Sequence, residues 1–168
     1  MSWSRPVALA PVFAAVLSVA GCFQPLYSVG GGGLESELQA IAIDPVPDRL
    51  GHYLGQELAF AFNGTGSKVA PHYRLVLIAH ERVTTPVIDS LSARASAATV
   101  AVDVDYRLFP SNGGEPIAAG TATSLAGYDR RSQRFANLRA ARDAEIRDAK
   151  TLADQIRTRV AAALATRL

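Results

Sequence analysis

The stretch AATVAVDVDYRLFPSNGGEPIAAGTATSLA, residues 97–126, decides the fold. Apolar and polar residues alternate in its first half, which predicts a strand over Ala97–Phe109. The turn Asn112-Gly113-Gly114 predicts a hairpin, from which a second strand returns over Pro116–Ala126. The first strand has an apolar face and a charged face, made respectively by Val100, Val102, Val104, Tyr106 and Leu108, and by Asp103, Asp105 and Arg107.

Elements upstream and downstream extend this hairpin into an α+β domain. Alternation predicts a strand over His72–Val83 and a short strand over Gln39–Ile43. Apolar residues at helical spacing predict one helix over Arg49–Phe62, capped by Asp48, and a long one over Phe135–Arg167. The order strand-helix-strand-strand-strand-helix predicts a two-layer α+β sandwich. Its four-stranded, mostly antiparallel sheet carries both helices on one face.

Composition excludes several classes of protein. The chain has 168 residues, of which 49% are hydrophobic, and a formal charge of +2, which together indicate one domain with a real core rather than a disordered chain. The single cysteine excludes an internal disulfide framework and a zinc site built on several thiolates. The small net charge gives no support for nucleic-acid binding.

The N-terminus is typical of an exported protein. Arg5 precedes a charge-free apolar run over Val7–Val19, which is shorter than the roughly 20 residues that a membrane-spanning helix needs. The sequence Val19-Ala20-Gly21-Cys22 resembles the bacterial lipobox, in which the cysteine thiol takes a diacylglyceryl group and becomes the mature N-terminus. The alternative is an ordinary signal peptide that ends near a chance cysteine.

Under the lipobox interpretation, the chain divides into three parts. Residues 1–21 are a lipoprotein signal peptide, residues 22–34 are a lipidated flexible tether containing four successive glycines, and residues 35–168 are the folded domain. Acyl chains on Cys22 would hold the protein on a membrane surface without a spanning helix. Phe23 stands where an aspartate would retain an enteric lipoprotein in the inner membrane, so we expect the outer membrane.

Short motifs spread over the whole mature chain resemble those of the LptE family, the lipopolysaccharide-assembly lipoproteins of the outer membrane, in their alphaproteobacterial form. No single motif is decisive, and the ordered combination carries the resemblance. One departure is that Phe23 follows the cysteine directly, where many relatives have an extra glycine. After the lipobox, the matching residues are Phe23-Gln24-Pro25-Leu26-Tyr27, Pro45 and Pro47, Arg49-Leu50, Tyr73-Arg74-Leu75, Tyr106-Arg107-Leu108, Gly127-Tyr128-Asp129, Phe135-Ala136-Asn137, Ala144 and Leu152-Ala153-Asp154-Gln155-Ile156.

The resemblance implies a function without chemistry of its own. LptE proteins sit as a plug inside the β-barrel of their partner LptD and help that barrel to assemble, and some bind lipopolysaccharide. The resemblance therefore implies an LptD-like barrel and lipopolysaccharide as partners, no cofactor, and a lipid-anchored location on the periplasmic side of the outer membrane.

A separate argument places a cluster of arginines at one end of the domain. In an antiparallel meander, the end of the strand over 72–83, the start of the next and the end of the last lie together. The arginines brought together are Arg82, Arg94, Arg130, Arg131 and Arg134. Guanidinium groups bind phosphate bidentately, so the cluster is a candidate site for lipopolysaccharide phosphates. A solvated rim of ordinary surface arginines, with Glu81, Asp89 and Asp129 nearby, is the alternative.

Charge is also distributed unevenly along the chain. Residues 130–168 hold ten basic and four acidic residues, whereas residues 22–129 hold six and eleven. The basic C-terminal helix could face anionic lipid or the acidic lumen of a barrel, or be a solvated helix with pairs such as Arg139–Asp143. Its predicted apolar stripe comprises Leu138, Ala141, Ile146, Ala149, Leu152, Ala153, Ile156, Val160 and Leu164.

Rival functions have little support in the sequence. A Gly-x-Ser-x-Gly elbow is absent, and His72 and His80 lie too far apart along one strand to share a metal. Asp103 and Asp105 have a spacing that two catalytic carboxylates could use, but Arg107 continues their row on an open sheet face. We therefore expect no enzyme. A generic envelope scaffold without lipopolysaccharide binding is the remaining alternative.

Overall fold

The computed structural model describes residues 33–64, 66, 69–88 and 95–167. Cys22, Arg94, the predicted signal peptide and nearly all of the predicted tether therefore lie outside the described residues. In chain order, the elements are α2 (Gly33–Gln39), β1 (Ile41–Ile43), α3 (Asp48–Asn63), β2 (Tyr73–Ile88), β3 (Ala95–Pro110), β4 (Ala118–Asp129) and α4 (Arg134–Ala165).

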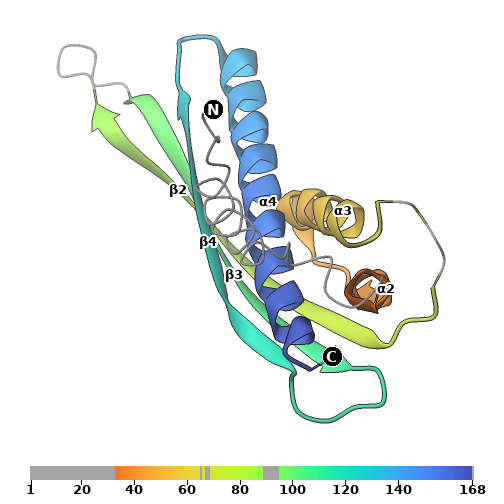
Figure 1. The fold of residues 1–168 in the computed structure, drawn as a ribbon. Coiled ribbons are helices and arrows are strands. Elements are labelled where there is room, and N and C mark those ends of the chain that lie inside the picture. Colours follow the sequence, from red (N-terminus) through yellow and green to blue (C-terminus); the bar gives the residue numbers. More distant parts are fainter. Residues whose placement is uncertain (1–32, 65, 67–68, 89–94, 168) are drawn as a thin grey trace, which may run out of the picture.

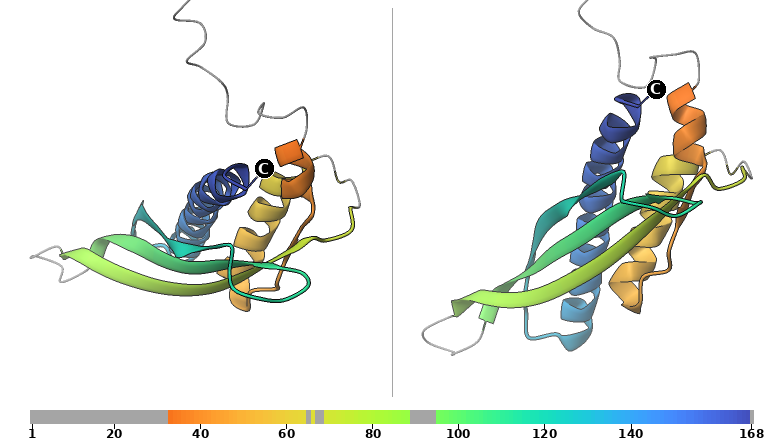
Figure 2. Two further views of the ribbon diagram at one scale, coloured as in Figure 1. Left: turned by 60° about the horizontal axis from the view of Figure 1, so that its bottom comes forward. Right: turned by 90° about the horizontal axis from the view of Figure 1, so that it is seen from below.

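The sheet has the predicted class and connectivity. Its strand order is β1-β2-β3-β4, with β1 parallel to β2 and the other two pairs antiparallel. The three long strands form a curved meander, and the helices lie on the same side of it (Figures 1 and 2). The prediction of a mostly antiparallel four-stranded sheet in a two-layer α+β fold is confirmed.

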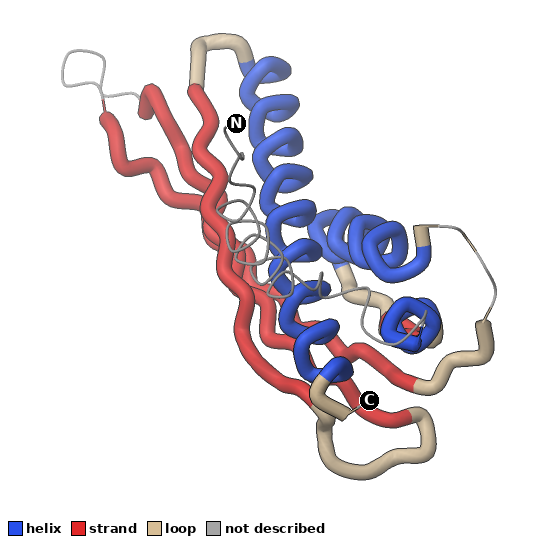
Figure 3. Tube along the Cα trace, viewed as in Figure 1, coloured by secondary structure: helices blue, strands red, loops and turns tan. Residues whose placement is uncertain are grey.

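The core lies between the helices and the apolar face of the sheet. β3 is the central strand, and its predicted apolar residues Val100–Leu108 are buried at alternate positions. α4 crosses β3 and β4, while α3 packs beside α4 over the β1 side of the sheet (Figure 3). Leu54 and Leu58 of α3 meet Leu152 and Ile156 of α4 in one continuous cluster.

Helix α2 is an element that the sequence did not predict. Leu34 and Leu38, one turn apart, are both buried against α3 and α4. A helix of only 7 residues contributes too few apolar positions for its periodicity to be recognised. As a result, the last residues of the predicted tether, Gly33 and Leu34, belong to the folded domain. β1 is also shorter than the predicted strand over Gln39–Ile43.

The start of α3 differs from the prediction as well. The N-cap residue is Pro47, without a side-chain hydrogen bond, so the prediction that Asp48 caps this helix is wrong. Asp48 instead adopts a φ of 73°, in the left-handed region that aspartate tolerates better than most residues. Pro45 and Pro47 fix the chain between β1 and α3, and the turn into the helix falls on Asp48.

Candidate functional site

Three of the predicted arginines lie together where β4 joins α4. Arg130 and Arg131 form the connection after Asp129, and Arg134 is the first residue of α4. All three side chains are exposed. The backbone N–H of Arg130 donates to the carbonyl of Ser96 at 2.8 Å, which holds the connection against β3. The structure thus brings this part of the cluster together.

Asn137 fixes the shape of this connection. The backbone N–H of Arg131 donates to Oδ1 of Asn137 at 2.7 Å, and Nδ2 of Asn137 donates back to the carbonyl of Arg131 at 2.8 Å. These reciprocal bonds hold the backbone of Arg131 against the first turn of α4. They give a structural reason for an asparagine in the Phe135-Ala136-Asn137 motif.

A hollow of about 580 Å³ is lined by Arg131, the middle one of the three arginines. Its charged lining residues are Asp129, Arg131, Asp143 and Arg147, so two carboxylates lie close to the arginine cluster. Asp143 is engaged by Arg147, whose Nη1 donates to its carboxylate at 2.5 Å, rather than by Arg139 as predicted. This ion pair leaves Arg131 as the lining cation that makes no side-chain ion pair within the described part of the chain.

Arg82 does not join this cluster. The sequence predicted that β2 ends at Val83, but the strand continues to Ile88 and carries its end away from Arg82. Arg82 lies opposite Ala101 on β3, whereas Asp129 at the end of β4 lies opposite Ala97. Its guanidinium donates to Asp103 at 2.9 Å on the open face of the sheet. Arg94, the fifth predicted arginine, lies outside the described residues.

The first turns of α4 expose an apolar surface among the basic residues. Phe135 is 83% exposed, Leu138 49% and Ile146 41%. The predicted stripe through Leu138 and Ile146 is therefore buried only in its second half, from Ala149 onward. The reason is that α3 packs beside the middle of α4, and the first turns of α4 project beyond it (Figure 1).

Two buried carboxylates attach α4 to its neighbours. Glu145, 3% exposed, accepts two hydrogen bonds from the guanidinium of Arg49 on α3, one of them from Nε at 2.7 Å. Asp148, 1% exposed, accepts from the Ser124 hydroxyl of β4 at 2.6 Å, and its Oδ2 has no hydrogen bond of ordinary geometry within the described residues. Both contacts lie C-terminal to Phe135 and Leu138, so they anchor α4 just beyond its exposed first turns.

Burial raises the pKa of Asp148 above its usual 3.8, although the Ser124 hydroxyl and Arg147 lower it. The folded state therefore binds this proton more tightly than the unfolded state, and stability falls as the pH rises from the unfolded pKa through the folded one. We expect Asp148→Asn to lose less thermal stability between pH 4 and 7 than the parent. Unfolding temperatures across this range test the effect, with exposed Asp154→Asn as control. Equal slopes in all three proteins would contradict it.

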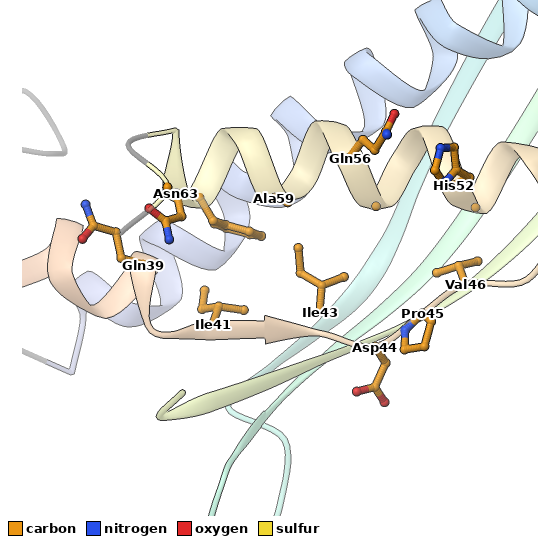
Figure 4. Close-up of a pocket in the computed structure, with 14 residues that line it drawn as sticks. Gln39, Ile41, Ile43, Asp44, Pro45, Val46, His52, Gln56, Ala59 and Asn63 are labelled. Atoms are coloured by element: carbon orange, nitrogen blue, oxygen red, sulfur yellow. The ribbon is translucent and has the colours of Figure 1, made fainter. Parts of the chain in front are cut away.

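A second hollow, of about 650 Å³, is a groove between β1 and α3. Ile41 and Ile43 point from β1 toward α3, with Ala59 across from them, while His52 and Gln56 lie along the helix (Figure 4). Asp44 is the one carboxylate in its lining. The groove can hold an apolar group, but it has no arrangement of nucleophile and base for chemistry. The sequence did not predict this groove, because it depends on where α3 lies relative to an edge strand.

Catalytic and metal chemistry find no support among the described residues. No group of three or more metal-ligating side chains comes together there, and no described helix could span a membrane. Asp103 is bonded to Arg82 and Thr123, and Asp105 accepts from Thr121 at 2.5 Å. Both carboxylates thus have hydrogen-bond partners on an open sheet face, which agrees with the interpretation of Asp103 and Asp105 as surface residues.

Solved structures of bacterial lipoproteins resemble this fold. A candidate lipoprotein from Caulobacter crescentus superposes with a TM-score of 0.67 at 25% identity, over 81% of this chain and 98% of that protein. A minor lipoprotein from Acinetobacter baumannii superposes with a TM-score of 0.54 at 15% identity, over 73% and 88% of the two chains, which shows a common fold alone. No curated protein matches the sequence significantly.

The family comparison agrees with the motifs in the sequence. The family model LptE, described as lipopolysaccharide-assembly, matches residues 38–160. The match runs from the end of α2 into the last turns of α4, and thus includes the sheet, the arginines at the start of α4 and both buried carboxylates. The chain belongs to the LptE family of lipopolysaccharide-assembly proteins.

Proposed function

We propose that this protein is a non-enzymatic lipoprotein, anchored through Cys22 on the periplasmic side of the outer membrane. There it plugs an LptD-like β-barrel, assists its assembly and takes part in lipopolysaccharide transport to the cell surface. Membership of the LptE family supports the process, and the lipobox at Val19–Cys22 supports the anchor. A generic envelope scaffold that does not bind lipopolysaccharide is the alternative.

The observation that carries lipopolysaccharide binding is the mixed surface at the start of α4. Arg130, Arg131 and Arg134 offer guanidinium groups that match phosphate oxygens, and Phe135 offers an exposed ring beside them. Lipid A combines the same two chemistries, because its phosphates lie next to acyl chains. Phe135, which is 83% exposed beside three cations, supports the ligand surface over a rim of arginines alone.

The position of this surface also fits a protein tethered at its other end. The described chain begins at α2, beside the C-terminal end of α4 (Figure 2). α4 has 32 residues, so its two ends are about 48 Å apart. A tether entering at α2 therefore leaves the arginine surface at the far end of the domain. In this arrangement it meets lipopolysaccharide away from the anchor.

Charge reversal tests the ligand surface. We expect Arg131→Glu with Arg134→Glu to weaken binding of purified lipopolysaccharide at least 10-fold, because two phosphate partners become repulsive. Binding would be measured by titration at two salt concentrations. The matched control is Arg107→Glu with Lys150→Glu, which changes net charge equally at exposed positions elsewhere. Equal affinity for the two double variants would remove the proposed surface.

Co-purification tests the barrel partnership separately. We expect the lipidated full chain to co-purify with the LptD-like barrel of the same cell. A Cys22→Ala chain given a cleavable signal should still do so after extraction, because the contact is made by the domain. A chain that binds lipopolysaccharide but recovers no barrel would refute the plug function and leave the ligand surface standing.

A further inference from the structure

The two edges of the sheet differ in whether their outward backbone groups have hydrogen-bond partners. Side chains of α4 cap the carbonyls along the outer edge of β4: Arg147 donates to Gly127 at 2.8 Å, and Gln155 donates to Thr123 at 3.1 Å. Arg159 caps a third carbonyl, that of Thr121. Capping of this kind prevents another strand from pairing with an exposed edge. The β4 edge is therefore closed.

The opposite edge is open. β1 pairs only with the first residues of β2, from Tyr73 to Leu75, and β2 then continues to Ile88 with no strand on its outer side among the described residues (Figure 2). The N–H of Tyr73 and the carbonyl of Leu75 both face the β1 side. Because alternate residues of a strand direct their backbone groups to the same side, the following odd-numbered residues face outward too. They are Leu77, Ala79, Glu81 and Val83.

The outward N–H and C=O groups of these residues are arranged as in a strand pair that lacks its second strand. Pairing of β2 with β3 is in regular register through Thr84, so the alternation holds over the whole strip. Within the described residues, no hydrogen bond from another segment reaches the outward backbone groups of these four residues. Pro86, which has no N–H, lies just beyond the strip in the irregular part of β2. We define this strip, Leu77–Val83, as the β2 edge.

An acidic notch adjoins the β2 edge. It has a volume of about 390 Å³ and lies where a continuation of β1 would run, between the start of α3 and the outer side of β2. Glu81 and Asp48 are its charged lining residues, and Leu77 and Val46 supply apolar surface. Burial raises the pKa of Glu81, and the neighbouring carboxylates of Glu145, Asp148 and Asp48 raise it further against the effect of Arg49. A cation facing Glu81 would relieve this repulsion.

We propose that the β2 edge binds an extended segment of the barrel partner, which adds a strand beside β2 and places a lysine or arginine against Glu81. This inference rests on the partnership proposed above. Backbone hydrogen bonds along the strip would supply affinity, and the notch would select the basic residue. Val83, 54% exposed, would be covered by an apolar residue of the added strand.

Charge argues against two other occupants of the β2 edge, the tether of this chain and a second copy of it. Residues 22–32 of this chain contain no lysine or arginine, so the tether cannot provide the cation. A second copy cannot provide it either. The side chains of the four odd-numbered residues of the β2 edge share one face of the strand, and Glu81 is the one charged residue among them. In any antiparallel self-pairing, Glu81 meets itself or a neutral residue. Neither of these occupants supplies the complementary cation, which favours a segment of a different chain.

Hydrogen exchange on the full lipidated chain, free and in its purified complex with the barrel, tests the proposal. In the free chain, the amides of Ala79, Glu81 and Val83 should exchange rapidly, whereas the even-numbered amides bonded to β3 are protected. In the complex, we expect the odd-numbered amides to slow at least 100-fold. Slow exchange in the dilute free chain would show that its own segment fills the edge. Slowing that depends on its concentration would show a second copy, and either result would overturn the proposal.

Two substitutions add an independent measurement. Val83→Pro removes an outward N–H without removing a bond to β3, and we expect it to weaken barrel capture at least 10-fold. Val83→Thr keeps the N–H and similar size, so it should bind like the parent. Glu81→Lys should weaken capture by a similar factor. A complex that forms with freely exchanging odd-numbered amides would overturn the edge proposal alone, while failure to form any complex would overturn the partnership and this inference together.

Discussion

Replacing Gly51 by alanine is expected to lower the free energy of unfolding by about 1–3 kcal/mol, the usual cost of overpacking a well-packed site. A Cβ at Gly51 would lie 2.6 Å from the carbonyl oxygen of Val46 and 2.7 Å from its Cγ1. The first of these atoms is backbone, held between Pro45 and Pro47, so it cannot rotate away. Helix α3 would have to move off the segment that joins it to β1.

Gly55, one turn further along α3, provides the matched control. A Cβ there would meet nothing within 4 Å, because this side of α3 faces the groove over Ile41 and Ile43. Gly55→Ala should therefore raise stability by about 0.5–1 kcal/mol, the gain from removing a glycine from a helix interior. Urea unfolding of both variants measures the two effects. Effects of the same sign at the two positions would show that the contact with Val46 does not control the packing of α3.

Alternation in the sequence predicts the meander well because each long strand buries one face. The predicted apolar face of β3 is the buried face, and the predicted hairpin joins β3 to β4. Strand ends are less predictable, since β2 and β3 continue past the helices, where no buried face is needed to hold the pairing. The extension of β2 beyond Val83 is also what separates Arg82 from the other arginines.

Periodicity does not reveal how much of a helix is covered. Leu138 and Leu152 cannot be told apart by spacing alone, yet Leu138 is half exposed and Leu152 is buried. The difference is set by where α3 lies, because the start of α3 reaches α4 at Glu145 and the first turns of α4 project beyond it (Figure 1). The arginine cluster was predictable in part, through Arg130, Arg131 and Arg134, because chain adjacency alone keeps these three together.

The buried carboxylates of α4 were not predicted, since charged residues are expected at the surface by default. A signal was nevertheless present. Glu145 and Asp148 flank the apolar positions Ala144 and Ala149, so they lie on or beside the side of the helix that faces the core. The matching cation, Arg49, stands in the Arg49-Leu50 motif that led to the family. Only the fold shows that Arg49 and Glu145, 96 residues apart, form one pair.

Replacing Arg49 is expected to lower the free energy of unfolding by about 3 kcal/mol, the low end for losing one partner of a buried ion pair. Arg49→Met removes both hydrogen bonds and leaves Glu145 with an uncompensated charge beside Glu81 and Asp148. The low end applies because Arg49 itself is 53% exposed, so water screens the pair and can partly hydrate the Glu145 carboxylate once Arg49 is replaced. Urea unfolding at pH 7 measures the loss.

The double variant Arg49→Met, Glu145→Leu shows whether the loss of stability in Arg49→Met comes from the stranded carboxylate or from the missing hydrogen bonds. If the loss in Arg49→Met comes from the stranded carboxylate, removing that carboxylate should restore stability to within about 1 kcal/mol of the parent, because apolar replacement of a buried pair is often neutral or better. Glu145→Leu alone should cost less than Arg49→Met, since the arginine left behind can turn to water. A double variant as unstable as the Arg49→Met protein would instead mean that the hydrogen bonds themselves hold α3 against α4. The exposed first turns of α4, and the arginines on them, would then depend on this pair for their position.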